Sequence, residues 1–557
     1  MQADSRKIIS ENIVADRSKL KIICVFLHRI YFGRIPYERQ YRGKKRKAMN
    51  ITELQQSYAS HPNVEGVCRL LKDNSVRHLY CGGLYASAAS LFSSVLVQRA
   101  TCPLVFILGD MEEAGYFYHD LTQILGTEQV LFFPSSFRRA IKYGQKDAAN
   151  EILRTEVLSR LQKGEEGLCV VTYPDALAEK VVSRKELGDN TLKLHAGERV
   201  DMNFVTDVLR SYGFEYVDYV YEPGQYAVRG SIIDVFSFSS EYPFRIDFFG
   251  DEVESVRTFE VETQLSKEKK ESIVIVPDLS HSLEKKGSGG MVSFLDFLPS
   301  DSLLAMRDFL WLRERIQTVH DESLTLQAIA ARESEENGAI TLEGKLIDGG
   351  EFTLRALDFR RMEFGNKPTG TPDATVSFHT TVQPIFHKNF DMVAESFREY
   401  LSRHYTIYIC SDSLKQTDRI RAIFEDRGDN ISFTAVERTL HEGFADDTLR
   451  ICVFTDHQLF DRFHKYNLKS DKARSGKVAL SLKELNQFTP GDYVVHTDHG
   501  VGRFAGLVRI PNGDTTQEVM KIVYQNEDVV FVSIHSLHKV SKYKGKEGEA
   551  PRLNKLG

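Results

Sequence analysis

Short apolar runs alternate with amphipathic segments in the part of the chain that follows Met49. The runs predicted to form buried strands are HLYCGGL (78–84), CPLVFIL (102–108), QVLFFP (129–134) and GLCVVTY (167–173). Residues 148–162 place Ile152, Leu153 and Val157 at helical spacing, a further helix is expected from about Ala88, and Asp110 is suited to cap the helix after the second run. Strands that alternate with helices predict a parallel sheet with helices on both faces.

The pattern changes at about residue 190. Residues 221–263 are rich in β-branched and aromatic residues and contain turn signals at 223–224, 239–240 and 250–251, which predicts an antiparallel β subdomain. Residues 276–383 return to the α/β pattern, with a low-complexity break at 284–290. A smaller α/β unit is expected over about 384–465, and a basic linker with Ser and Gly follows at 469–477.

The pattern becomes all-β from Tyr493 onwards. A Pro-Asn-Gly-Asp sequence at 511–514 lies between two strand-like runs, and Asn-Gly in that position is a strong hairpin signal. Five short strands over about 55 residues predict a small barrel. The last residues of the chain have no apolar pattern, so we expect the sequence to have been cut here.

Charge is distributed unevenly along the 557 residues. Residues 1–48 hold 13 Lys and Arg against 4 Asp and Glu, a net +9, which leaves −15 for the remainder of a chain whose total is −6. An acidic body binds DNA phosphates poorly and suits protein partners. The first 48 residues either hide a targeting helix around 22–33 or are an upstream extension that precedes the folded part, and we favour the extension.

The seven cysteines are scattered, without a CxxC pair or metal-ligand spacing, and most lie in apolar runs. We therefore expect reduced core cysteines in a cytoplasmic protein, with no metal site. No apolar run approaches the roughly 20 residues that a membrane-spanning helix needs.

The loop after the first strand, GGLYASAAS (82–90), has the layout of a phosphate-binding loop. Such a loop needs G-x-x-x-x-G-K-[ST], in which the lysine neutralises phosphates and the hydroxyl holds magnesium. With Gly83 as the first glycine, Ala88 replaces the second glycine, Ala89 replaces the lysine and Ser90 keeps the hydroxyl. The sequence predicts an ordinary tight turn in which ATP is not turned over.

No catalytic constellation stands out elsewhere. No D-E-x-[DH] sequence follows a buried strand, and no Ser/His/Asp or Cys/His arrangement is evident. The histidines are dispersed, apart from His535 and His538, which we expect to lie on a surface. We therefore predict no catalytic residues in this chain.

Three segments together resemble the bacterial transcription-repair coupling factor (Mfd) family. Residues 227–264 (AVRGSIIDVF…FRIDFFGDEVESVRTFEVETQ) resemble domain 2 of the excision-repair protein UvrB and of Mfd, and 132–177 resemble the first UvrB-like domain. Residues 490–543 (PGDYVVHTDHGVGRFAGL…VSKY) resemble the CarD-like RNA-polymerase-interacting domain of that family. The resemblance covers about 60–557, and this order of segments fits only that family.

The resemblance implies a multidomain α/β fold. It consists of a degenerate P-loop, RecA-like domain of the UvrB type with an inserted antiparallel β domain, a small α/β domain and a small C-terminal barrel of the Tudor or CarD-like type. The expected parts are, in order, an extension (1–48), domain 1a (49–188), domain 2 (189–283), domain 1b (284–383), domain 3 (384–466), a linker (467–484), the polymerase-interacting domain (485–545) and the start of a linker to a translocase that the chain lacks (546–557).

The departures from the family pattern concern the nucleotide site. In the segment FLDFLPSDSLLAMRDF (294–309), Arg307 and Asp308 occupy the positions of the acidic pair of the UvrB ATPase motif. A cation therefore stands where a metal-activating acid is expected. The DNA-clamping hairpin of UvrB is also replaced by the short stretch AEKVVSRKELGD (178–189). ATP hydrolysis and strand clamping are thus both predicted to be absent.

Domain 2 of the family docks the repair protein UvrA. Alternation along FRIDFF predicts that Phe244, Ile246 and Phe248 lie on one face of a strand and that Arg245 and Phe249 lie on the other. An outward Phe beside an Arg is typical of an interface hot spot, although Phe249 packed on a neighbouring domain would show the same pattern. Arg229, Arg245 and Phe249 match the residues that the family uses to bind UvrA.

The C-terminal barrel of the family binds the β subunit of RNA polymerase. An open hairpin strand can pair with a strand of a partner, although hairpin strands are also simply barrel walls. We place the contact at Val508, Arg509, Ile510, Met520 and Lys521.

The resemblance therefore implies an adaptor that joins stalled RNA polymerase to UvrA. We expect no cofactor in this chain, with ATP and magnesium confined to the translocase of the complete family member, which also makes most of the DNA contacts. A monomer is expected. The alternatives are a UvrB-like helicase that hydrolyses ATP at 82–90 and a plain DNA-binding module, which the acidic body supports poorly.

Overall fold

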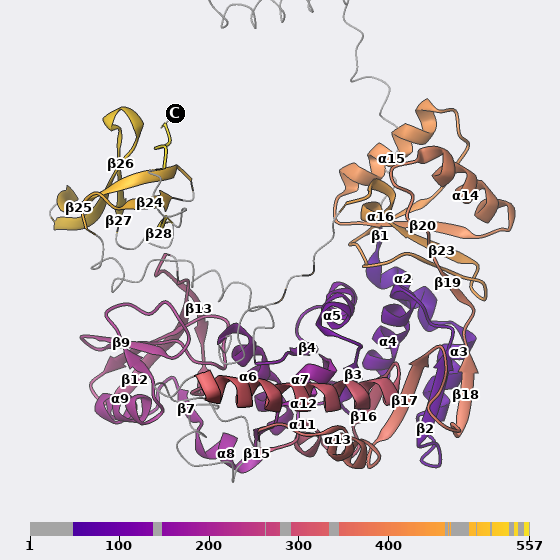
Figure 1. The fold of residues 1–557 in the computed structure, drawn as a ribbon, viewed down its shortest axis with the longest axis horizontal. Helices are drawn as coiled ribbons and strands as arrows, with labels where there is room; N and C mark the ends of the chain where they lie inside the picture. Colours follow the sequence, from indigo (N-terminus) through magenta and orange to yellow (C-terminus); the bar gives the residue numbers. More distant parts are fainter. Residues whose placement is uncertain are drawn as a thin grey trace, which may run out of the picture. The chain divides into compact units, whose positions relative to one another are not determined.

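A computed structural model describes residues 48–136, 148–261, 263–278, 291–333, 345–462, 466, 468, 489–496, 498–512, 515–533, 540–543 and 551–555. Residues 1–48 and 49–557 form two separate units, and the account below concerns the second (Figure 1). The predictions made for residues 1–47, for the break at 284–290, for most of the linker and for His535 and His538 lie outside the described residues.

A seven-stranded sheet forms the first α/β part, with the order β18-β2-β17-β16-β3-β5-β4. Every neighbouring pair is parallel, as the sequence predicts. Its strands are β2 (His78–Gly82), β3 (Leu104–Ile107), β4 (Val130–Phe133), β5 (Cys169–Thr172), β16 (Leu303–Met306), β17 (Arg360–Gly365) and β18 (Ala374–Ser377). The segments before and after the inserted β domain thus build one sheet together.

Helices connect and cover these strands, and their apolar faces share one continuous core with the sheet. Asp110 caps α5 as predicted, because its side chain accepts hydrogen bonds from the backbone N–H groups of Glu112 and Glu113. The helices are α2 (Ile51–Ala59), α3 (Pro62–Leu70), α4 (Ser87–Arg99), α5 (Met111–Leu125), α6 (Ala148–Gln162), α7 (Pro174–Ala178), α8 (Arg184–Asp189), α11 (Phe294–Phe297), α12 (Phe309–Glu333) and α13 (Gly349–Ala356). The predicted helix from about Ala88 corresponds to α4.

The inserted β domain contains a six-stranded sheet in the order β13-β12-β11-β10-β9-β8. Its strands β9 to β13 are antiparallel, as predicted, and the short β8 pairs with β9 in parallel. The strands are β8 (Glu215–Tyr216), β9 (Gln225–Arg229), β10 (Ile232–Val235), β11 (Phe244–Phe249), β12 (Glu252–Phe259) and β13 (Ser266–Lys270). Helix α9 (Met202–Ser211) packs Val205 and Leu209 into the core on one face of this sheet.

Two short ladders join the inserted domain to the chain around it. Strand β7 (Leu192–His195) pairs with β14 (Ser272–Ile275), and β6 (Val181–Val182) pairs with β15 (Met291–Val292). The stretch 178–189, predicted to replace a long hairpin, forms only β6 and α8.

A second α/β sheet follows, in the order β1-β21-β20-β23-β22-β19. The chain's first described strand, β1, and β19 both join it from outside the segment 384–466. The elements are β1 (Met49–Asn50), β19 (Thr380–Val382), α14 (Phe390–Ser402), β20 (Thr406–Ser411), α15 (Leu414–Asp426), β21 (Thr434–Glu437), β22 (Phe444–Asp446), β23 (Ile451–Thr455) and α16 (Asp456–Phe460).

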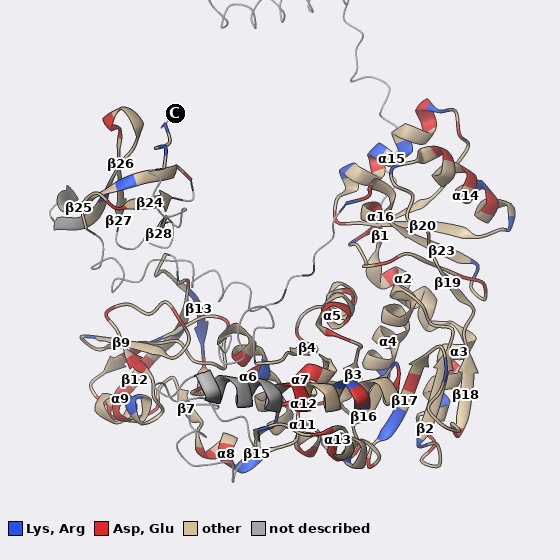
Figure 2. Cartoon of the chain, in the orientation of Figure 1, with Lys and Arg blue, Asp and Glu red and all other residues tan. Residues whose placement is uncertain are grey.

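The C-terminal part is a five-stranded antiparallel sheet in the order β27-β26-β25-β24-β28. Five strands match the sequence prediction, whereas closure into a barrel stays a prediction, because β27 and β28 are the outer strands of the described ladder. The elements are β24 (Tyr493–His496), β25 (Gly500–Asn512), β26 (Thr515–Val523), the 3-10 turn η2 (Gln525–Glu527), β27 (Val529–Ser533) and β28 (Val540–Lys542). Figure 2 shows acidic and basic positions interspersed along most of the described elements.

Candidate docking surfaces and the phosphate-loop pocket

Strand β11 of the inserted domain divides its side chains between two faces, as alternation predicts. Phe244, Ile246 and Phe248 are buried in the core beneath α9. Phe249, the last residue of the strand, is 78% exposed. A large aromatic ring in water at the end of a buried strand contributes little to folding and is available to a partner.

The two arginines predicted to lie beside Phe249 share one carboxylate. Asp234 on β10 is fully buried, and its two oxygens accept hydrogen bonds from Arg245 Nε at 2.7 Å and Nη2 at 2.9 Å. Arg229 forms an ion pair with the same carboxylate. The carboxylate raises the pKa of Arg245 above its usual value through these hydrogen bonds, so this guanidinium stays charged.

Each of the two guanidinium groups also packs on an aromatic ring. Arg245 lies over the ring of Phe259 at 4.5 Å, and Arg229 lies over the ring of Tyr219 at 5.0 Å. The Arg245 side chain is 14% exposed and that of Arg229 is 35% exposed. Arg229 is therefore the arginine that is more open to a partner, while Arg245 mainly holds the surface together. Asp234 did not figure in the sequence analysis, because nothing local indicates that two arginines on neighbouring strands converge on it.

The outer edge of β25 is open over part of its length. Strand β24 covers only Gly500–Arg503, whereas β26 pairs with β25 as far as Asn512 on the other side. Val508, Arg509 and Ile510 thus lie on a stretch of β25 whose second edge has no strand beside it among the described residues. The side chains of Arg509 and Ile510 are outside that description.

Met520 does not fit its predicted role. It is fully buried in the core of the C-terminal sheet together with Ile522 and Phe504. Neighbouring residues of a strand point to opposite faces, so Met520 and Lys521 cannot both be presented to a partner. Lys521, which is half-buried, is the outward residue of the two. The prediction that Met520 contacts a partner is therefore wrong, because its side chain is buried.

The loop after β2 is a tight turn, as predicted. Gly83 has φ +76°, and a Cβ at this position would lie 2.0 Å from the carbonyl oxygen of Phe378. The first backbone N–H groups of α4 already have acceptors within the chain, because Ser87 N donates to Glu442 O and the amides of Ala88 and Ala89 bond to the preceding turn. The helix start is therefore not available as a phosphate cradle.

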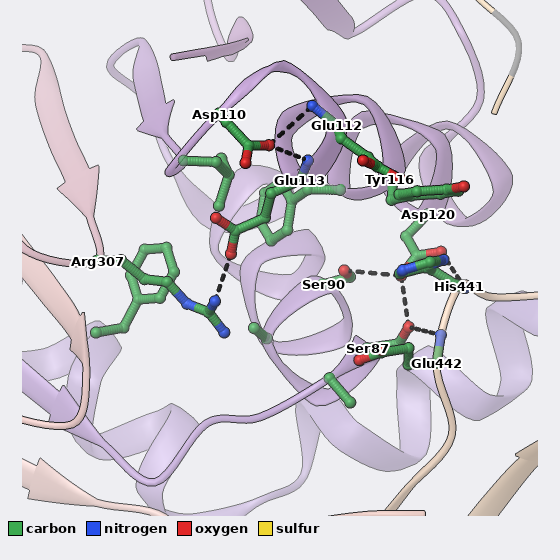
Figure 3. A pocket seen from close by; sticks show the side chains of 15 residues that line it. Ser87, Ser90, Asp110, Glu112, Glu113, Tyr116, Asp120, Arg307, His441 and Glu442 are labelled. Carbon is green, nitrogen blue, oxygen red and sulfur yellow. Dashed lines mark hydrogen bonds and ion pairs between the residues drawn. The ribbon is translucent and has the colours of Figure 1, made fainter. Parts of the chain in front are cut away.

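A buried carboxylate occupies the place beside the start of α4 (Figure 3). Asp120 on α5 accepts hydrogen bonds from Ser87 Oγ at 2.6 Å and Ser90 Oγ at 2.9 Å through one oxygen. Its other oxygen accepts the backbone N–H of His441 at 2.7 Å, and Glu442 N donates to Ser87 Oγ at 3.0 Å. Burial raises the pKa of Asp120 to about 7, against the lowering effect of these donors. In a phosphate-binding loop the hydroxyl at the position of Ser90 holds magnesium. Here that hydroxyl donates to the carboxylate of Asp120 instead.

Arg307 lines the same pocket, whereas Asp308 has a different role. Arg307 forms an ion pair with Glu113 of α5. Asp308 accepts the backbone N–H of Trp311 at 3.0 Å and so caps α12. Burial and the nearby Glu113 raise the pKa of Glu442, while the charge of Arg307 opposes them. The pocket measures about 410 Å³, and its lining carboxylates are Asp110, Glu112, Glu113, Asp120 and Glu442.

These carboxylates would repel the phosphates of a nucleotide. Within the described ranges, no group of three or more His, Cys, Asp or Glu side chains is arranged to hold a metal ion. None of the helices in those ranges is both long and apolar enough to cross a membrane. The six cysteines in the described part of the chain have free thiols, and four of them are buried.

Comparisons with known proteins match two parts of the chain to described domain families. Residues 192–281 match the UvrB interaction domain, and residues 488–544 match the CarD-like/TRCF RID domain. The first match contains Arg229, Arg245 and Phe249, and the second contains Val508 and Lys521.

Several curated proteins resemble most of the chain. The chain is 23% identical over 553 residues to a transcription-repair-coupling factor of Bacillus subtilis (strain 168), a match that covers 85% of this chain and 46% of that protein. It is 24% identical over 539 residues to the factor of Staphylococcus aureus (strain bovine RF122 / ET3-1) and over 540 residues to that of strain USA300, with the same coverage. The chain therefore spans about half the length of the curated relatives it matches. The resemblance predicted from the sequence, to the N-terminal part of such factors, is confirmed.

Proposed function

We propose that this relative of the transcription-repair-coupling factors is an adaptor of transcription-coupled nucleotide excision repair. Its inserted β domain binds UvrA, and its C-terminal sheet binds the β subunit of a stalled RNA polymerase. The observation that carries the proposal is Phe249, which is 78% exposed in the part of the chain that matches the UvrB interaction domain.

The second docking site rests on the shape of the C-terminal sheet. Among the described residues no strand pairs with the second edge of β25 at 508–510, so this edge can take up a strand of the partner, a common mode of recognition between proteins. This edge lies within the match to the CarD-like/TRCF RID domain. Val508, Arg509, Ile510 and Lys521 form the proposed contact.

The phosphate-loop pocket has no catalytic part in this function. Ala89 supplies no cation, the Ser90 hydroxyl donates its hydrogen bond to Asp120, and most charged side chains that line the pocket are carboxylates. ATP-dependent translocation on DNA, with bound ATP and magnesium, is proposed for the complete family member and is assigned to a region that this chain does not include. In the complete protein, the distal motor pushes on the DNA behind the polymerase while the adaptor recruits UvrA.

Binding of purified UvrA tests the first docking site. Phe249→Ser is expected to weaken the complex by ~2–4 kcal/mol, which is the effect of removing a hot-spot aromatic. Phe204→Ser is the matched control, since Phe204 is also an exposed Phe of this domain but lies on α9, on the opposite side of the sheet. Equal affinities for the Phe249→Ser variant and the unmodified chain would remove the basis of the proposal.

Binding of the polymerase β subunit tests the second site. Arg509→Glu reverses a charge on the open part of β25, and we expect it to weaken the complex by about tenfold or more. Arg503→Glu makes the same change on the same strand, where β24 covers the edge, and should leave binding unaltered. Similar losses in both variants would point to a general disturbance of the sheet.

An ATPase measurement with and without DNA separates the adaptor from a UvrB-like helicase. We expect no turnover by this chain. Turnover that disappears in a Ser90→Ala variant would favour the helicase.

A further inference from the structure

The last described segment, residues 551–555, contacts the C-terminal sheet, although the sequence predicts the start of a linker here. Asn554 makes the contacts. Its backbone N–H donates to the carbonyl oxygen of Val501 at 2.9 Å, and its Oδ1 accepts the N–H of Val501 at 3.0 Å. The backbone oxygen of Asn554 accepts the N–H of Gln525 at 3.0 Å. A single residue thus bridges the start of β25 and the turn that follows β26.

These hydrogen bonds continue a ladder that β26 leaves unfinished. Arg503 of β25 pairs with Val523, the last residue of β26, and the same register would place Gln525 opposite Val501. The chain instead turns away into η2 after β26. Asn554 takes up the N–H and C=O of Val501 on the side of β26, while β24 pairs with this part of β25 on the other side. The start of β25 is therefore held from both sides.

Gly500 leaves the space for this contact. It has φ +74°, and a Cβ at this position would lie 2.6 Å from Cγ of Asn554. The side chain of Asn554 therefore packs directly on the first residue of β25. The match to the CarD-like/TRCF RID domain ends at residue 544, so this contact comes from outside the matched segment. We call residues 551–555 the strap.

We propose that the strap is part of the second docking site and that Asn554 is a positioning residue, which holds β25 for the strand of a partner. This inference rests on the proposed function, which places that strand beside 508–510. Strand addition needs a fixed register, because a slip by one residue turns every side chain to the other face. The register of β25 against β26 shifts between Phe504 and Leu507. The strap fixes the end of β25 before this shift and so keeps 508–510 in one register.

Hydrogen–deuterium exchange measures whether the strap holds β25. Asn554→Ala removes the side-chain acceptor of the Val501 N–H, and we expect this amide to exchange about tenfold faster. Asn554→Asp keeps an oxygen at the same position and should restore slow exchange. Lys555→Ala, at the next and also exposed residue of the strap, is the matched control and should exchange like the unmodified chain. Equally slow exchange of Val501 in Asn554→Ala would overturn the proposal.

Binding of the polymerase β subunit tests the positioning role. We expect Asn554→Ala to weaken the complex about fivefold, Asn554→Asp to bind like the unmodified chain, and neither variant to alter UvrA binding. A loss that Asn554→Asp does not restore would refute positioning through the Val501 hydrogen bond.

The Arg509→Glu variant separates this inference from the proposed function. Normal β-subunit binding by Asn554→Ala, with Arg509→Glu still weakened, would refute the positioning role and leave the proposed docking site standing. Normal binding by both variants would refute the docking site itself.

Discussion

Replacing Asp120 with asparagine tests whether an uncharged group fits the phosphate-loop pocket better than a carboxylate does. The amide has nearly the same size, and its oxygen and nitrogen can still bond to His441 N and to the serine hydroxyls. The substitution thus removes the charge and keeps the packing. We expect the variant to differ from the unmodified chain mainly in how its stability depends on pH.

The size of the expected change in folding stability follows from the pKa of Asp120. Burial raises the pKa of Asp120 to about 7 in the folded chain, whereas an unfolded Asp titrates near 4. The folded state therefore binds this proton more tightly, and the resulting stability is complete below about pH 4 and lost as pH rises through about 7. Three pKa units correspond to about 4 kcal/mol, of which ~2–3 kcal/mol falls between pH 5 and pH 8.

Urea unfolding at pH 5 and pH 8 measures this difference. Trp311, the single tryptophan of the chain, lies in the first turn of α12, four residues after Arg307, and reports on this part of the fold. Relative to the unmodified chain, Asp120→Asn should gain ~2–3 kcal/mol on going from pH 5 to pH 8. Asp110→Asn, at the exposed cap of the same helix, is the control and should show no such gain. The same difference at both pH values would mean that Asp120 stays ionised and that its three donors outweigh burial.

Three further changes test the surrounding structure. Gly83→Ala should lower the free energy of unfolding by ~2 kcal/mol or more in the same urea assay, because a positive φ and the nearby Phe378 oxygen leave no room for a Cβ; a neutral result would contradict the turn geometry. Ala89→Lys should not create affinity for a fluorescent ATP analogue, because one added cation does not offset the carboxylates that line the pocket. Micromolar binding by this variant would show instead that the missing lysine alone prevents nucleotide binding. Asp234→Asn should destabilise the inserted domain by ~3–5 kcal/mol in thermal unfolding, because its two arginines lose their buried partner, whereas the exposed Asp207→Asn should not.

The order of strands and helices was largely predictable because each one depends on local periodicity. The assembly of the sheets was less so. Strands β16, β17 and β18 complete the first sheet although the whole inserted domain lies between them and β5. Likewise β1 joins a sheet whose other strands begin more than 300 residues later. Such pairings are set by the burial of distant faces against one another, which one-dimensional patterns do not contain.

In the candidate sites, too, features set by neighbouring residues were predictable and features set by distant contacts were not. Alternation was sufficient to predict that Phe249 points away from the core, because only immediate neighbours decide it. The same rule, applied consistently, would have excluded Met520. The role of Asp120 was not predicted, because it depends on a hydrogen bond from His441, which is 321 residues away in sequence. An Asp on the otherwise apolar face of a helix was the available signal, since such a side chain needs a buried partner.

Side chains and backbone groups of the chain itself engage the donors at the start of α4. A missing lysine alone would leave a weak anion site at the start of α4. Here the Ser87 hydroxyl and Ser90 hydroxyl hold the Asp120 carboxylate, the Ser87 amide holds the Glu442 carbonyl, and the remaining wall is acidic. His441 and Glu442 come from the loop before β22, so the same contacts fasten the second α/β sheet to the first. The contacts of Asp120 and Glu442 therefore tie the start of α4 to the second α/β sheet and engage donors that a phosphate at this helix start would need.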